Sequence, residues 1–403
     1  MIEHPGPVAW ARLYVGRMRT FSISRILVAA TLLALVAGRS TAQDKKDKPD
    51  PAQQEEIRSL VVAVDDQMAG KPSASTLPIK WGLQHFVKAQ GDKTYVPFVI
   101  TVDAGNTAAL PIGVYLRVAK RGDVGTAPAP PVEPKKKGAV PGESHRFVFE
   151  DMYFIDLPAP VAGKPVVLRR AFAVDPGDYD VYVAVKVKAP AAAGTAATAG
   201  AATTAAATPA PAAPATAAPA GATPAAEVRI GSLKQEVTVP SMGGDLTTSS
   251  IIVADKVDVL TAAIAPDHQA DNPYTFGQMK LTPALTAAFA PKDDLNVIFW
   301  IYNASPDPAT KKPNVLVEFG FSRKTGTGET YFNKTDPQEM NAATLPPQFD
   351  LAAGHQLPGS LQVPLASFPE GDYHLQIKVT DKVSGKTLSR DVMFAVAKPA
   401  AAQ

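Results

Sequence analysis

The chain has 403 residues, 46% of them hydrophobic, which is enough for packed interiors and too long for one ordinary core. Its 38 prolines disfavour a helical bundle, and the absence of cysteine excludes disulfides, thiolate metal sites and cysteine nucleophiles. The formal charge is +2, but the first 42 residues hold five arginines and one acid, so the remainder carries about −2, which gives no electrostatic basis for binding nucleic acid or an anionic membrane surface.

The N-terminus, residues 1–42, is predicted to be a secretory signal peptide. Basic residues precede the apolar run Ile26–Gly38, and small residues follow at Ser40–Ala42, where a signal peptidase would cut. The run is shorter than the roughly 20 residues that span a bilayer. We therefore expect cleavage after Ala42, a secreted or periplasmic protein, and no membrane span afterwards. An uncleaved anchor and a start at Met18 remain alternatives.

Two halves of the following chain share an order of elements. After a charged spacer at 43–56, the run Ser59–Asp66 predicts a first strand and is answered by Ser249–Lys256. Strand, polar loop and second strand then follow at Tyr95–Gly122 and again at Asn296–Gly326. This correspondence favours one β domain present in two copies, and therefore an all-β fold.

Each half also contains a Pro-(x)-Gly-Asp-Tyr turn that enters a strand with alternating apolar residues. The glycine allows a tight turn, the aspartate can bond to nearby backbone, and the tyrosine resembles the tyrosine corner of immunoglobulin-like sandwiches. The alternative is a surface turn that merely ends in tyrosine. The predicted corner residues are Gly177, Asp178, Tyr179, Gly371, Asp372 and Tyr373.

The tract 189–226 uses only alanine, proline, threonine and glycine, so it cannot form a packed core. The repeat places it inside the last hairpin of the first domain, because Val228–Pro240 matches the final strand of the second copy. We therefore predict that Val228–Pro240 lies antiparallel beside Tyr179–Lys188. The predicted domains are 57–240, with 189–226 as a disordered insertion, and 246–397, followed by a tail at 398–403.

No reactive constellation with specificity is present: the sequence lacks H-E-x-x-H, a G-x-S-x-G elbow, a Walker loop and a dinucleotide fingerprint. We predict no catalytic, cofactor-binding or metal-binding residue, although an assembled site in an enzyme remains an alternative. The acidic groups Asp175, Asp178, Asp180 and Asp293, Asp294 fit either a calcium site or ordinary turns and caps, of which the latter is favoured.

Aromatic residues are the remaining candidates for ligand contact. Trp81 and Phe86 are the better candidates for an exposed contact and a possible ligand contact. The run Val297–Asn303 lacks a polar face, which predicts a strand buried on both sides, with Trp300 as the core tryptophan of a central strand. A stacking platform for a ligand is the alternative for this run.

The segment Leu365–Val396 resembles the β-sandwich modules that accompany GWxTD-motif and von-Willebrand-factor-A-related proteins of bacterial envelopes. The resemblance covers Leu246–Val396 and, more loosely, Arg58–Pro240. The GWxTD motif itself and the D-x-S-x-S metal motif are absent. The resemblance implies tandem immunoglobulin-like or fibronectin-type-III-like sandwiches in an exported protein. We expect a non-enzymatic interaction or structural protein of the envelope, which binds a protein or polysaccharide; the alternative is a carbohydrate-binding or adhesin-like module pair.

Overall fold

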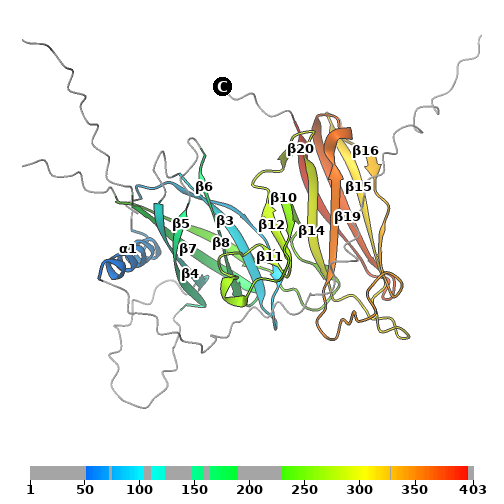
Figure 1. The fold of residues 1–403 in the computed structure, drawn as a ribbon, viewed down its shortest axis with the longest axis horizontal. Coiled ribbons are helices and arrows are strands. Elements are labelled where there is room, and N and C mark those ends of the chain that lie inside the picture. Colours follow the sequence, from blue (N-terminus) through cyan, green and yellow to red (C-terminus); the bar gives the residue numbers. More distant parts are fainter. Residues whose placement is uncertain are drawn as a thin grey trace, which may run out of the picture.

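The computed structural model describes residues 51–71, 75–103, 110–122, 147–157, 164–188, 228–326 and 328–397. Within these ranges the chain is mainly β, with several largely antiparallel sheets and one α-helix (Figure 1). The predicted signal peptide, residues 43–50 of the predicted spacer, the tract 189–226 and the tail 398–403 lie outside the described residues.

The described strands form two pairs of sheets, one pair in each half of the chain. Sheets A (β1, β2, β3, β6) and B (β4, β5, β7, β8) come from the N-terminal half, and sheets C (β9 to β12, β14, β18) and D (β13, β15 to β17, β19, β20) from the C-terminal half. The N-terminal strands are β1 (Ile79–Gln84), β2 (Val87–Lys88), β3 (Thr94–Val102), β4 (Leu110–Lys120), β5 (Phe149–Leu157), β6 (Val166–Val174), β7 (Gly177–Lys188) and β8 (Val228–Val239). The C-terminal strands are β9 (Thr247–Thr248), β10 (Ile252–Val259), β11 (Thr275–Phe276), β12 (Met279–Pro283), β13 (Ala288–Phe289), β14 (Asp294–Tyr302), β15 (Val315–Thr325), β16 (Gly328–Lys334), β17 (Gln338–Met340), β18 (Leu357–Pro364), β19 (Gly371–Asp381) and β20 (Thr387–Val396).

The elements stack as five layers along the long axis of the molecule: helix α1 (Pro51–Met68), then sheets B, A, C and D (Figure 1). A cluster of buried hydrophobic residues fills each space between neighbouring layers. Two clusters are the interiors of the halves, between B and A and between C and D. The third joins the halves between A and C, and the fourth lies under α1.

The strand that was expected at Ser59–Asp66 is wrong, because these residues belong to α1. Pro51 occupies the first helical position, and Gly70, with φ +69°, follows the last turn, which are the positions that favour proline and glycine. Leu60 and Val64, four residues apart, are fully buried against sheet B. No described helix is long and apolar enough to cross a membrane.

The predicted pairing of the strand after the tract 189–226 is confirmed. β7 pairs with β8 antiparallel along its whole length, from Gly177 opposite Val239 to Lys188 opposite Val228. The two halves also pair their strands in corresponding orders, β5-β4-β7-β8 in sheet B and β16-β15-β19-β20 in sheet D. Sheets A and C continue the correspondence, with β1-β3-β6 matching β10-β14-β18.

Candidate functional site

The two predicted corner tyrosines make the same bond in both halves. The Tyr179 hydroxyl donates to the carbonyl of Asp175 at 2.8 Å, and the Tyr373 hydroxyl donates to the carbonyl of Pro369 at 2.6 Å. Both rings are buried, and both bonds reach back four residues. Gly177 and Gly371 have φ of +152° and +149°, in the region that favours glycine. The two bonds fix the turns that lead into β7 and β19.

Trp81 and Phe86, predicted as exposed contacts, are half-buried in the protein itself. The Trp81 ring stacks on Phe98 with centroids 4.4 Å apart, and its indole nitrogen donates to Gln84 at 3.0 Å. Phe86 packs against the cluster between the halves, and its backbone N–H donates to the Ser250 hydroxyl at 2.8 Å. Neither side chain extends freely into solvent.

The aromatic strand β14 is buried on both faces, as predicted. Its tryptophan, however, faces the N-terminal half and not the interior between sheets C and D. Phe299 belongs to the interior between sheets C and D. Trp300, 6% exposed, instead belongs to the cluster between the halves, where its ring packs on Phe276 with centroids 4.6 Å apart. The expectation that Trp300 fills the interior of its own domain is therefore wrong, because β3 of the other half covers this face.

A buried polar network fixes the two halves to each other. Pro97 lies within β3 and has no N–H, and the strand segments that pair with this edge of β3 are the separate β1 and β2. Its carbonyl accepts from the His85 N–H at 2.9 Å and from the Tyr274 hydroxyl at 3.1 Å. The Tyr274 hydroxyl lies 3.0 Å from His85 Nδ1, and burial lowers the His85 pKa to about 4. His85 is therefore neutral at pH 7. Because the Tyr274 hydroxyl donates its one proton to the Pro97 carbonyl, the hydroxyl oxygen can accept from the Nδ1–H tautomer of the imidazole.

For four of the five acidic groups considered for calcium, those other than Asp175, the structure shows partners of the carboxylate within the chain. Asp180 is buried and lies 2.9 Å from Lys234 Nζ, and Asp178 accepts from the Thr238 hydroxyl at 2.5 Å. Asp293 accepts from a backbone N–H, and Asp294 from a glutamine side chain. Among the described residues no three His, Cys, Asp or Glu side chains are grouped to hold a metal ion.

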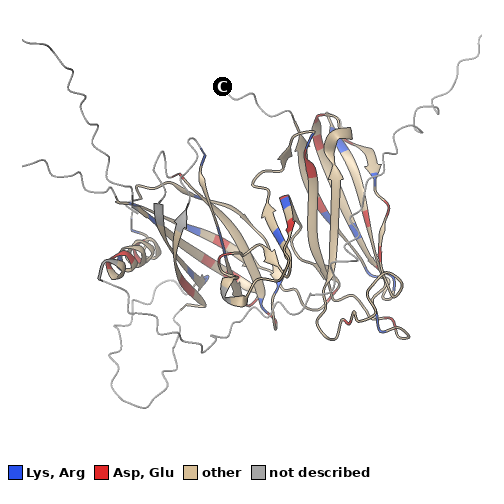
Figure 2. Ribbon diagram, in the orientation of Figure 1, with Lys and Arg blue, Asp and Glu red and all other residues tan. Residues whose placement is uncertain are grey.

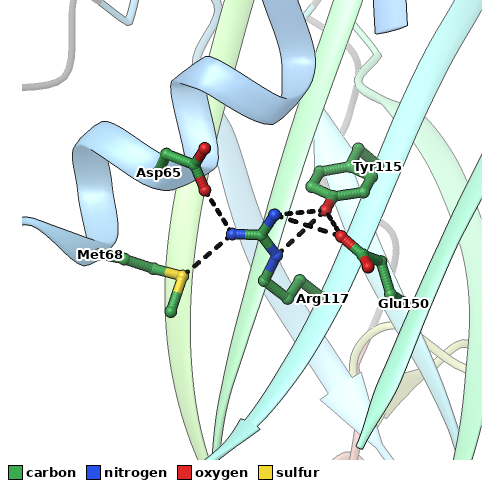
Figure 3. Close-up of polar contacts among 5 residues, drawn as sticks. All are labelled: Asp65, Met68, Tyr115, Arg117 and Glu150. Atoms are coloured by element: carbon green, nitrogen blue, oxygen red, sulfur yellow. Dashed lines mark hydrogen bonds and ion pairs between the residues drawn. The ribbon is translucent and has the colours of Figure 1, made fainter. Parts of the chain in front are cut away.

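Helix α1 covers a charged cluster that was not expected from the sequence (Figure 3). Arg117, 4% exposed, lies on the outer face of β4. Its guanidinium donates to Asp65 at 2.5 Å, to the Tyr115 hydroxyl at 2.6 Å and 3.0 Å, and to Glu150 at 3.2 Å. Tyr115 in turn donates to Glu150. A buried arginine with two carboxylates and a hydroxyl is a compensated charge that attaches the helix to the sheet.

The Arg117 cluster has the composition of a structural clamp rather than of a catalytic site. Burial and the nearby Asp65 raise the pKa of Glu150. Its carboxylate, however, is already bound in an ion pair with Arg117. The residues on the outer face of β4 and β7 could have indicated this cluster from the sequence. Tyr115, Tyr182 and Ala184 stand at positions where an uncovered sheet would carry charges, which indicates a covering element.

A cleft with a volume of about 690 Å³ lies in sheet C. β10 pairs with β14 only from Ile252 to Ala254 and then turns away to pair with β12. The Asn296 amide lies in the fork and donates to the Ala254 carbonyl at 3.2 Å. Val259, Phe289 and Leu361 contribute to the apolar part of the lining.

Charged groups of both signs surround the cleft. Asp255 and Asp293 lie on it with Lys256 and Lys292. Partial burial and the nearby Asp293 raise the pKa of Asp255. Elsewhere Figure 2 shows lysine, arginine and acidic residues interspersed along the strands of both halves.

Comparison with known proteins adds little to this geometry. No family model matches the chain, and no curated protein is similar to it. One solved structure to which part of the chain is similar is a family 123 glycoside hydrolase from Clostridium perfringens, at 11% identity, covering 37% of this chain and 28% of that one. Its TM-score is 0.16, so the likeness carries no argument about fold or activity.

Proposed function

We propose that the protein is an exported, non-enzymatic interaction protein of a bacterial envelope, built from two immunoglobulin-like β-sandwiches. The corresponding strand orders of the halves and their matching tyrosine bonds support the tandem arrangement. The signal-like sequence at 1–42 supports export. His85 and Asp180, a buried histidine and a buried acid, are engaged in polar contacts within the protein, which supports a structural rather than a catalytic role for them.

The cleft between β10 and β14 is the proposed binding site, and its ligand is an extended segment of a partner protein. A volume of about 690 Å³ lies within the range of 300–1,000 Å³ that is typical of ligand pockets. The fork lies inside a sheet, where β10 separates from β14, and Val259 on its lining is 58% exposed. An extended segment can place alternate side chains on that apolar lining, and the mixed charges of the rim suit a polar peptide backbone.

A display library of linear peptides tests this proposal. Peptides selected on the intact protein are expected to bind the wild type and to lose at least tenfold in affinity with Val259→Asp. Val259 lines the cleft and is 58% exposed, so the substitution adds a charge without disturbing a core. The matched control is Val228→Asp on β8, 47% exposed and outside the cleft, which should bind as the wild type does.

Two results would contradict the proposal. Peptides that bind Val259→Asp as tightly as the wild type would place recognition outside the cleft. Hydrolase activity that a substitution of one Asp or His removes would contradict the non-enzymatic assignment.

The carbohydrate-binding alternative stays a prediction. Its test is a polysaccharide pull-down with Trp81→Ala, which should abolish binding if that ring is the contact. The stacking of Trp81 on Phe98 leaves the peptide cleft as the better supported site.

A further inference from the structure

A second pocket, of about 300 Å³, lies between the two halves where the edge strand β6 meets β12 and the segment before β11. Its lining includes Arg169 and Arg170 from β6, Thr275 from β11, and Lys280 and Thr282 from β12. It is separate from the cleft of the proposed function, and its ligand does not depend on that proposal.

Buried polar atoms without hydrogen-bond partners concentrate in this pocket. Four such side-chain atoms occur in the described part of the chain: Arg169 Nε, Arg170 Nε, Thr275 Oγ1 and Asp180 Oδ1. Asp180 Oδ1 lies 3.7 Å from Arg121 Nε, so an ion pair accounts for it. The other three all belong to residues that line the pocket. Because buried polar groups are nearly always satisfied, three such atoms among the residues that line one pocket point to a bound molecule at this place.

The charge in the pocket is positive and only partly compensated. Arg170 is 5% exposed, and burial lowers the pKa of its guanidinium below the usual value. Its Nη1 donates to the Arg169 carbonyl at 2.8 Å and, at 3.5 Å, to that of Ala270, while the guanidinium lies 4.5 Å from the centre of the Tyr153 ring. Within the described ranges no carboxylate forms an ion pair with Arg169 or Arg170.

Three acidic groups lie near enough to influence the charge. Asp271 and Asp151 act on Arg170, and Asp255 interacts with Arg169. Asp271 is exposed and is itself part of the pocket lining. A doubly charged phosphate would meet this carboxylate, whereas a single negative charge meets less repulsion.

We propose that this pocket binds a small monocarboxylate between the two halves of the protein. The carboxylate oxygens accept hydrogen bonds from Arg169 Nε and from the Thr275 hydroxyl, Arg170 adds positive charge to the same lining, and the aliphatic part of the ligand lies against Ile155, Leu168 and Leu281. The size of the pocket limits the ligand to about one amino acid or one sugar acid.

The test uses the full chain and measures binding by calorimetry and by the shift in melting temperature. The probes are propionate, D-glucuronate, inorganic phosphate and propionamide, the last an uncharged match for propionate. We expect propionate or glucuronate to bind with a Kd on the order of 1 mM or tighter, and propionamide to bind at least tenfold more weakly.

Two variants assign the binding to this pocket. Thr275→Val keeps the shape of the side chain and removes the unpartnered hydroxyl, so the ligand-free variant should melt no lower than the wild type and bind at least fivefold more weakly. Arg169→Gln should also weaken binding. The control Lys324→Gln removes one exposed positive charge outside the pocket and should bind as the wild type does.

Each remaining outcome overturns the proposal. Equal binding of propionate and propionamide would show that no carboxylate is recognised. Tighter binding of phosphate would assign another class of anion. Binding unchanged in both Thr275→Val and Arg169→Gln would place the site elsewhere, and binding of no probe would mean that the three atoms meet only water.

Discussion

The N-terminal and C-terminal halves pair their strands in corresponding orders, yet they differ in what covers their outermost sheets. In the N-terminal half, α1 lies on sheet B, and the outer face of β7 carries Tyr182 and Ala184, both buried. In the C-terminal half, the equivalent face of β19 carries His374 and Lys378 in exposed ion pairs. The same strand framework therefore tolerates either surface, because the outer face of a sheet is free to follow whatever lies over it.

The largest expected effect on stability comes from the corner tyrosine, which both halves bury in their own interiors. Tyr373→Ala should destabilise the C-terminal half by about 3–5 kcal/mol, because it removes a fully buried ring that packs on Phe394 and Phe368. Thermal and urea unfolding measure the change. Tyr373→Phe is the control and should lose only about 1 kcal/mol, the typical value of the hydroxyl's bond to Pro369.

A similar loss for Tyr179→Phe in the N-terminal half would extend the correspondence between the halves. An unfolding midpoint unchanged in Tyr373→Ala would contradict the corner interpretation.

The next largest effect on stability is specific to the face of sheet B that α1 covers. Leu60→Ala should cost about 2–5 kcal/mol, because the Leu60 side chain on α1 is fully buried against sheet B. Its fit is tight, since a methyl group added at Gly113 of β4 would lie 3.0 Å from Leu60 Cδ1. Val62→Ala is the matched control: Val62 is 49% exposed on the same helix and should change stability by less than about 1 kcal/mol. Equal effects of the two substitutions would mean that α1 does not pack on sheet B in solution.

Two histidines are expected to change the free energy of unfolding with pH in opposite directions. The His85 pKa is lowered to about 4 by burial, whereas His in an unfolded chain titrates near 6.5. The stability from neutral His85 is present above pH 6.5 and is lost as pH falls toward 4, by about 3 kcal/mol. His374 bonds to Glu329 and Asp391, which raise its pKa. Its contribution is present below pH 6.5 and is lost as pH rises through its folded pKa.

The His374 contribution should stay below about 1 kcal/mol, since its partners are largely exposed. Unfolding followed from pH 4 to 8 measures both effects. A His85→Gln variant should flatten the acid side of the profile, and His374→Gln the neutral side. An unchanged acid limb in His85→Gln would show that another group controls the loss.

The smallest effect is expected where the halves differ in the length of their last hairpin. Lys188 pairs with Val228, so a two-residue Asn-Gly turn can replace residues 189–227. Because loop-closure entropy changes slowly with length, the melting temperature should change by only a few degrees. A collapse of the N-terminal half in this variant, seen as loss of its β signal in circular dichroism, would contradict the hairpin interpretation.

Local pattern in the sequence determined the strands, because alternating residues from Val181 to Val187 and from Leu375 to Val379 can bury one face only as strands. The duplicated turns predicted the bonds of Tyr179 and Tyr373, and the match between strand endings predicted the β7–β8 pair. The helix at 51–68 was missed, because the short apolar run Leu60–Val64 is compatible with either period.

Only the tertiary structure decided which surfaces became interiors. Trp300 and Phe299 are neighbours of similar character, yet one fills the space between sheets C and D and the other the space between the halves. Likewise Arg169 and Arg170 gave no signal as adjacent residues of a strand. Their pocket exists because β12, more than 100 residues away, packs against the edge of β6. Such contacts depend on packing between distant segments, which periodicity along one strand does not encode.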